Sequence, residues 1–528
     1  MIRLARERRT GCHATAMKLS ALFPLITLAL TPCVFAEVTL PSVLSSGMVL
    51  QRDKPVPVWG MAAAGEKVTV SFSGQTRETS AAADGRWQVQ LEPLSANATG
   101  QTLVVQASNK LELTDVLVGE VWLGSGQSNM EWPVSRSENG AQAAAAAQFP
   151  AIRLFQVPKG SSPDRQFTCN AEWKPCTPET AANFSAVLFF MGQALHNELQ
   201  VPIGLINSSW GGSRIEPWTP SEGFAMVPSQ RDLHRAIRSA TPGTGEYKNS
   251  MNAWLGNVDQ WVRESRAAID KGTAPTPIPD RPGPLALGYQ GVIGLYNSMI
   301  HPLVPFAIRG AVWYQGESNL GEGQAYLERK KALIGGWRQV WQQGDFPFYT
   351  VQLAPFNYGN LPPEKARQNT SLPELQEAQN DTLLHIPNTG VAVTNDIGDF
   401  NDIHPTNKAE VGRRLSLIAL ARDYGRAGLV YSGPVFASAK AGDGKLRISF
   451  TETGSGLATR DGQPPTEFEL AGADGKFHPA EAVIDGNDVV VSSPQVPAPV
   501  QVRHAWNQVP RANLINKEGL PASAFRSR

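Results

Sequence analysis

Short apolar runs alternate with stretches of helical periodicity from residue 116 to about residue 424, and this alternation constrains the fold more than any other feature of the chain. Continuous apolar strands with helices between them are typical of a parallel sheet covered on both faces. The expected strands are residues 116–123, 152–157, 203–206, 308–314, 348–353 and 390–394. The clearest expected helices are residues 184–199, 324–341 and 407–424. This central part of the chain therefore predicts an α/β fold.

The regions on either side of this central part show a different pattern. Short runs in which apolar and polar residues alternate are separated by turn residues. Residues 87–91 and 446–450 are examples, and no helical period competes with the alternation there. Because the two β regions flank the core, we predict that they pack together as one accessory sandwich. The expected domains are residues 37–115 (β), 116–427 (α/β) and 428–528 (β).

Residues 219–290 interrupt the α/β rhythm. A polar stretch with helical character at residues 252–270 leads into a proline-rich segment at residues 276–284. We interpret this region as an insertion in the α/β domain, close to its functional site.

Composition narrows the class of protein. The chain has 528 residues, of which 41% are hydrophobic, and this is enough for two or three cores. Lys and Arg together number 47, as do Asp and Glu, so the formal charge is zero. A neutral chain gives no indication of nucleic acid or of an anionic membrane as a partner.

The N-terminus resembles an export signal. Basic residues precede an apolar stretch at residues 19–31, which is too short to span a bilayer as a stable anchor, and Ala36 fits the small-residue rule for cleavage. We predict a signal peptide at residues 1–36, with Met17 as an alternative true start, and a secreted or periplasmic mature protein. Cys169 and Cys176 then remain, either as a small disulfide or as two free thiols.

Ser128 is the candidate nucleophile. The strand at residues 116–123 runs straight into the small and polar residues 124–129 (GSGQSN). Glycines let the backbone turn sharply there, and open α/β sheets bind ligands at the carboxyl ends of their strands. A serine hydroxyl is a poor nucleophile unless an adjacent base activates it. The sequence therefore has to supply a base elsewhere.

His404 is the best-placed base among the seven histidines that follow the signal region. It lies in an acidic loop after the strand at residues 390–394 and just before the helix at residues 407–424. Asp402 is close enough in sequence to orient the imidazole and to stabilise its charged form, as the third member of a catalytic triad does. We interpret Ser128 and His404 as a serine esterase site.

Two further polar turns end strands of the same sheet. One follows residues 312–314 and holds Gln315, whose amide offers donors for an oxyanion hole, and Glu317, an alternative partner for His404. The other follows Ile206 and contains the glycine pair Gly211 and Gly212, whose N–H groups are also candidate oxyanion donors. Several such turns within one α/β segment predict a shared site.

Four motifs follow the strands of this sheet: residues 126–130 (GQSNM), 210–218 (WGGSRIEPW), 313–319 (WYQGESN) and 402–405 (DIHP). Together they resemble the sialate O-acetylesterase family of SGNH hydrolases, which is itself similar to the acetylxylan-esterase groups of carbohydrate esterases. Residues 46–51, 57–60 and 513–525 extend this resemblance over nearly the whole mature chain.

The resemblance implies a flavodoxin-like three-layer α/β/α core, a β-rich accessory domain, and no metal or organic cofactor. It implies that Ser128 is the nucleophile and His404 the base, and that Gly212 and Gln315 join the Ser128 N–H in the oxyanion hole. Many SGNH enzymes place Asp three residues before the histidine, where this chain has Asn401. The acid is therefore Asp402 or Glu317. The candidate substrate-binding residues are Gln127, Trp132, Trp210, Arg214, Trp218 and Asn319.

The predicted substrate is an O-acetylated mono-, oligo- or polysaccharide. Sialic acid and plant-wall xylan or xyloglucan both suit the family; a sialate carboxylate would need a cation such as Arg214, whereas the neutral charge of the chain leans towards a neutral polysaccharide. A secreted carbohydrate-binding protein without activity is the alternative. An α/β-hydrolase lipase is not indicated, because the chain has no Gly-x-Ser-x-Gly pentapeptide, and no His-Glu-x-x-His ligand pair points to a metal.

Overall fold

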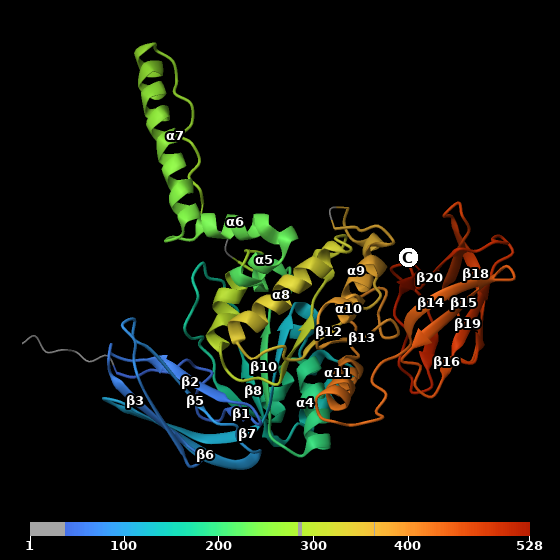
Figure 1. Cartoon of the computed structure of the whole chain (residues 1–528), viewed down its shortest axis with the longest axis horizontal. Coiled ribbons are helices and arrows are strands. Elements are labelled where there is room, and N and C mark those ends of the chain that lie inside the picture. Colours follow the sequence, from blue (N-terminus) through green and yellow to red (C-terminus); the bar gives the residue numbers. More distant parts are fainter. Residues whose placement is uncertain (1–36, 284–287, 364, 528) are drawn as a thin grey trace, which may run out of the picture. The chain divides into compact units, whose positions relative to one another are not determined.

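The computed structural model describes residues 37–283, 288–363 and 365–527 (Figure 1). The predicted signal peptide at residues 1–36 lies outside the described residues. Residues Glu37–Arg528 form one compact unit. Among the described residues, no helix combines the length and apolar character that crossing a bilayer requires.

A parallel sheet forms the centre of this unit, as the sequence predicts. Its strand order is β13-β12-β11-β7-β10-β8-β9, and every neighbouring pair is parallel except β8 with β9. The strands are β7 (Lys110–Gly126), β8 (Phe149–Gln156), β9 (Trp173–Cys176), β10 (Ile203–Ser209), β11 (Gly310–Tyr314), β12 (Phe348–Val351) and β13 (Thr389–Ala392). The predicted α/β class is confirmed.

Helices cover both faces of the sheet (Figure 1). Trp313 of β11 packs edge-on against Trp337 of α8 (Ala325–Trp341), with ring centroids 6.2 Å apart. Gly124 of β7 is one residue out of phase with Trp313 and faces the opposite way; a Cβ there would lie 2.5 Å from the Leu188 side chain of α4 (Ala186–Leu199). The helices α4 and α11 (Lys408–Arg422) pack together on that second face. The result is an α/β/α core.

The N-terminal strands belong to this core. β7 pairs with β6 (Asn97–Gln106) through its first half and with β10 and β11 through its second, so one strand runs across the domain boundary expected at residue 115. The N-terminal and α/β residues also share one hydrophobic cluster. The other N-terminal strands are β1 (Val49–Gln51), β2 (Val56–Met61), β3 (Lys67–Phe72), β4 (Gln75–Ser80) and β5 (Arg86–Leu91).

The C-terminal strands form a β domain with a hydrophobic cluster of its own. Its antiparallel sheet has the order β14-β15-β19-β18-β17-β20-β22, and in the described part of the chain none of these strands pairs with an N-terminal strand. The expected single sandwich of residues 37–115 with 428–528 is therefore wrong, because β7 draws the N-terminal strands into the core. The strands are β14 (Val435–Gly442), β15 (Lys445–Thr451), β17 (Phe468–Ala471), β18 (Phe477–Asp485), β19 (Asp488–Ser492), β20 (Gln501–His504) and β22 (Phe525–Arg526), beside the pair β16 (Leu457–Thr459) and β21 (Leu514–Asn516).

The insertion between β10 and β11 is helical, as expected. It contains α5 (Ser221–Met226), α6 (Arg231–Ala240) and α7 (Gly245–Asp270), the long green helix in Figure 1. The proline-rich segment returns along α7, because the indole N–H groups of Trp254 and Trp261 donate to the carbonyls of Pro279 and Thr276. The short helices α9 (Ser371–Asn380) and α10 (Thr382–His385) follow β12.

The two remaining cysteines are free thiols in the structure, so the disulfide alternative is not the one adopted. Cys176 ends β9, where its pairing with Phe149 of β8 buries it, and burial raises the pKa of its thiol to about 12. Cys169 lies in the preceding loop, with its Sγ 3.3 Å from Ser42 Oγ.

Candidate active site

Ser128 begins the short helix α1 (Ser128–Glu131), directly beyond the carboxyl end of β7. The turn depends on Gly126, which has φ +136° and lies so close to β11 that a Cβ would be 2.2 Å from the Tyr314 carbonyl oxygen. No other residue fits this backbone at this spacing. The glycine-rich turn therefore delivers the Ser128 hydroxyl to the edge where the parallel strands end.

His404 meets Ser128 at this edge. Its Nε2 lies 2.9 Å from Ser128 Oγ, although 276 positions separate the two residues in the chain. Its Nδ1 lies 3.3 Å from Asp402 Oδ1, and the same oxygen accepts the His404 backbone N–H at 2.8 Å. The structure thus brings together the hydroxyl, the imidazole and the carboxylate that the sequence singled out, in the order of a catalytic triad.

The imidazole is suited to act as a base. Partial burial is the largest influence on its pKa and lowers it from the usual value, against the opposing attraction of Asp402. The Trp132 ring stacks on His404 with centroids 4.9 Å apart, and the Arg136 guanidinium lies over Trp132 at 4.1 Å. His404 is therefore held in one orientation, and its lowered pKa favours the neutral form that a base requires.

Glu317, the alternative acid, does not contact His404. It begins η6 (Glu317–Asn319), and its Oε1 accepts a hydrogen bond from Asn129 Nδ2 at 2.5 Å. Its other carboxyl oxygen is buried and has no partner among the described residues. Of the two alternatives, the geometry favours Asp402 as the partner of His404.

The glycine loop after β10 lies against the serine. A Cβ on Gly211 would come within 3.2 Å of Ser128 Cβ, and the Gly211 N–H donates to Glu131 Oε2 at 2.7 Å. Gly212 has φ +76°, and its carbonyl accepts hydrogen bonds from Gln290 Nε2 and Ser318 Oγ. Within the described part of the chain, no acceptor is assigned to the Gly212 N–H. This N–H remains a candidate oxyanion donor.

Gln315 does not have the free amide that the sequence suggested. The residue is fully buried, and its Nε2 donates to Ser213 O at 3.1 Å and to Asn319 Oδ1 at 2.8 Å. Its Oε1 accepts from the Tyr326 hydroxyl at 2.7 Å. Because both of its N–H groups already have acceptors, Gln315 supports the Gly212–Ser213 loop and is not itself placed as an oxyanion donor.

Several predicted sugar contacts are internal residues. Trp218 is fully buried, and its indole N–H donates to Ser213 Oγ; Asn319 is fully buried and donates to Glu216 and Glu322. Trp132 is 8% exposed, between Arg136 and His404. We correct these three assignments to packing and positioning, since their position after a strand did not reveal which way the side chains point.

Arg214 is partly exposed, but its charge is already paired. It forms ion pairs with Glu216 at 2.9 Å and with Glu322, and its Nη1 donates to Ser318 O. Arg329 joins the same two carboxylates. A substrate carboxylate would therefore compete with two internal ones for Arg214.

Two aromatic side chains beside the glycine loop that follows β10 are accessible to solvent. Trp210 is partly exposed and lies 6.1 Å, centroid to centroid, from Tyr289, which is 44% exposed. Tyr289 lies 3.5 Å from where a Gly212 Cβ would stand. Tyr289 is a site candidate that the sequence signals only by its position at the end of an insertion expected near the site. Gln127, just before Ser128, is buried, with its Oε1 3.4 Å from the Ser318 N–H.

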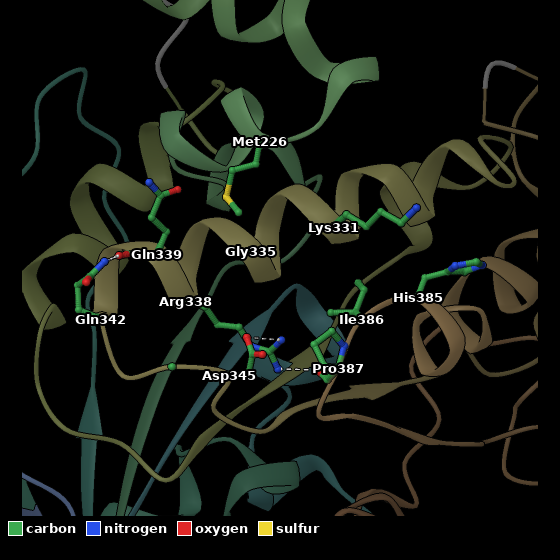
Figure 2. Close-up of a pocket in the computed structure, with 11 residues that line it drawn as sticks. Met226, Lys331, Gly335, Arg338, Gln339, Gln342, Asp345, His385, Ile386 and Pro387 are labelled. Atoms are coloured by element: carbon green, nitrogen blue, oxygen red, sulfur yellow. Dashed lines mark hydrogen bonds and ion pairs between the residues drawn. The ribbon is translucent and has the colours of Figure 1, made fainter.

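A separate hollow of about 470 Å³ lies beside the C-terminal half of α8 (Figure 2). Its lining includes Arg338, whose guanidinium donates to the carbonyls of Phe346 and Pro387 and lies 3.4 Å from Asp345. None of Ser128, His404 and Asp402 lines it. The Arg338 guanidinium in this hollow is engaged in contacts within the fold, and we do not assign the hollow as the active site.

The fold and this geometry together define an α/β hydrolytic enzyme with a Ser-His-acid constellation at the carboxyl ends of a parallel sheet. A family profile described as a carbohydrate esterase, sialic acid-specific acetylesterase, matches residues 287–420. Rat sialate O-acetylesterase is 31% identical over 433 residues, which are 75% of this chain and 75% of the rat protein. The human sialate O-acetylesterase is 30% identical over 434 residues, 75% of this chain and 72% of that protein.

A solved structure is consistent with these sequence similarities. A carbohydrate acetylesterase from Xanthomonas citri is 40% identical and superposes with a TM-score of 0.76, covering 93% of this chain and all of the other. This chain belongs to the sialate O-acetylesterase family and is a carboxylic-ester hydrolase. No finding favours the alternative of a binding protein without activity.

Proposed function

We propose that this enzyme releases acetate from O-acetylated sugars through an acetyl-enzyme on Ser128. The observation that carries the proposal is the 2.9 Å contact between Ser128 Oγ and His404 Nε2. In the first step Ser128 Oγ attacks the acetyl carbonyl carbon, and His404 accepts the hydroxyl proton. Asp402 orients the imidazole and stabilises its charged form.

The tetrahedral intermediate then collapses. The N–H groups of Ser128 and Gly212 stabilise the oxyanion, and His404 gives its proton to the departing sugar oxygen as the C–O bond breaks. A water molecule, deprotonated by His404, attacks the acetyl-enzyme in the second half-reaction. Acetate leaves, and Ser128 recovers its proton.

For the substrate we propose a neutral O-acetylated saccharide, stacked on Trp210 and Tyr289. The proposal is supported by the paired charge of Arg214, whose guanidinium is already held by Glu216 and Glu322. Acetate release from acetylated xylan and xyloglucan, measured beside 9-O-acetyl sialic acid, tests this choice. Faster turnover of the sialate would contradict it.

We also propose that the mature enzyme is exported. This rests on the residue pattern of positions 1–36 alone. The intact mass of the protein recovered from the periplasm or the medium tests it, since cleavage after Ala36 gives a chain that begins at Glu37. Full-length protein retained in the cytoplasm would contradict export.

A further inference from the structure

Behind the triad lies a buried pair of charged residues that the mechanism above does not use. Lys408 is fully buried at the start of α11, and its Nζ donates to Asn129 Oδ1 at 2.6 Å. The opposite end of the same amide donates from Nδ2 to Glu317 Oε1 at 2.5 Å. One asparagine side chain therefore joins a buried ammonium to a buried carboxyl.

Asn129 also joins the two halves of the active site. It directly follows Ser128 in α1, and its Nδ2 donates to the carbonyl of Ile403 at 3.0 Å, the residue just before His404. In this orientation the amide oxygen accepts from Lys408 and Nδ2 donates to Glu317 and Ile403, so turning the amide would break these three hydrogen bonds. Its orientation is thus fixed from both ends.

Burying the charged groups of Lys408 and Glu317 lowers the stability of the folded state. Burying a charged group without full compensation costs several kcal/mol of stability in general, so a buried ion pair is weak support for the folded state. Burial lowers the pKa of Lys408 to about 7 and raises that of Glu317. A fold that only needed packing here would gain from apolar residues.

We propose that Glu317 and Lys408 are positioning residues that hold Ser128 and His404 in contact through Asn129. This inference rests on the proposed function and assigns Glu317 a role other than that of the triad acid. Each residue fixes one end of the Asn129 amide, which in turn ties the serine helix to the histidine loop. A displacement of about 1 Å at a reacting group can lower a rate about a hundredfold.

Lys408 also affects the pKa of His404, the catalytic base. The groups that face His404 are Asp402, Arg136, Lys408 and the Trp132 ring; those that face Lys408 are Glu317, Asp402 and the rings of Tyr314 and Trp132. A positive Lys408 lowers the pKa of His404. Its replacement by methionine therefore raises that pKa, and the acidic limb of kcat/KM moves to higher pH.

The test compares Glu317→Leu, Lys408→Met and the double variant with Lys330→Met. Lys330 is a matched control: it is also fully buried, its Nζ donates to Thr350 Oγ1 at 2.5 Å, and it lies on α8, away from Ser128. We expect each single variant at the site to lower kcat about 10- to 100-fold with little change in KM. The double variant should lose no more than the worse single, because the two residues act on one amide.

The control should lose thermal stability but keep its kcat and its pH profile. The inference is overturned if Lys330→Met lowers kcat as much as Lys408→Met, if the two losses multiply in the double variant, or if the acidic limb of Lys408→Met does not move. Glu317→Leu removes the acceptor of Asn129 Nδ2, whereas Glu317→Gln keeps the shape and the acceptor and should keep kcat near wild type. This pair tests the positioning role even where Lys408→Met fails to fold. Activity that persists in Ser128→Ala would instead overturn the proposed function.

Discussion

The catalytic edge and the C-terminal β domain both bury titratable side chains, but only at the catalytic edge do hydrogen bonds connect these side chains to one another. At the catalytic edge Asn129 connects Lys408 and Glu317, and each hydrogen bond joins segments that are far apart in sequence. In the β domain His504 is fully buried between the rings of Phe468 and Phe525, and neither ring nitrogen has a partner in the part of the chain that the structure describes. Connected buried groups position reacting atoms, whereas an isolated one only makes stability depend on pH.

The comparison predicts that substitutions at the catalytic edge change rate more than stability. Ser128→Ala should lower kcat for acetate release by at least about a thousandfold, because the nucleophile is lost. The melting temperature should stay within about 2 °C of wild type, since only one partly exposed hydroxyl is removed. Steady-state kinetics and calorimetry on the same preparation measure both; a loss of folding with the loss of rate would break the comparison.

Asp402→Asn should have the next largest effect. An amide can hold the imidazole in the wrong tautomer and cannot stabilise its positive charge, so we expect kcat to fall about 10²- to 10⁴-fold. The exposed position of Asp402 predicts little change in the melting temperature. A near-normal kcat would transfer the role of the acid to Glu317.

A substitution of Tyr289, beside the glycine loop, should weaken substrate binding. Tyr289→Ala removes an exposed ring beside Trp210, and we expect KM for the acetylated polysaccharide to rise about tenfold, or about 1.4 kcal/mol. Initial rates over a range of polysaccharide concentrations separate KM from kcat. An unchanged KM would remove Tyr289 from the sugar site.

The smallest effect on rate, and a clear one on stability, is expected at His504. Burial lowers the pKa of His504 to about 3 in the folded state, below the value near 6.5 of an unfolded chain. Between these pH values the unfolded chain binds more protons, so stability is lost as the pH falls below 6.5. His504→Phe should shrink the difference between the melting temperatures at pH 7 and pH 4, with kcat unchanged.

His385→Phe is the matched control for that experiment, since His385 is an exposed histidine of α10. It should leave the pH dependence of the melting temperature as in wild type. An equal effect of the two variants would mean that His504 does not carry the acid sensitivity.

The sequence was most informative about the elements and the edge where they end. The strands around Ser128 and the loop of His404 followed from apolar periodicity and from residues that turn the chain, and both are local signals. It did not reveal that β7 continues across residue 115, because the alternation simply changes from one-sided to fully buried along a single strand.

The sequence also could not predict which polar side chains are buried and which partners they contact. Gln315, Asn319 and Trp218 all follow strands and look like ligand contacts, but the fold turns their side chains inward. Conversely, Asn129 and Lys408 look like ordinary helix-start residues, and 279 positions separate them. Such contacts depend on tertiary packing, which no local pattern specifies.

The account depends on Ser128 being the nucleophile that His404 activates. Incubation with a fluorophosphonate, followed by mass spectrometry of the intact protein and its peptides, tests this directly. We predict a single adduct on the peptide that contains Ser128, formed much more slowly in His404→Ala and absent from Ser128→Ala. An adduct on another residue, or none on a protein that still releases acetate, would contradict the account.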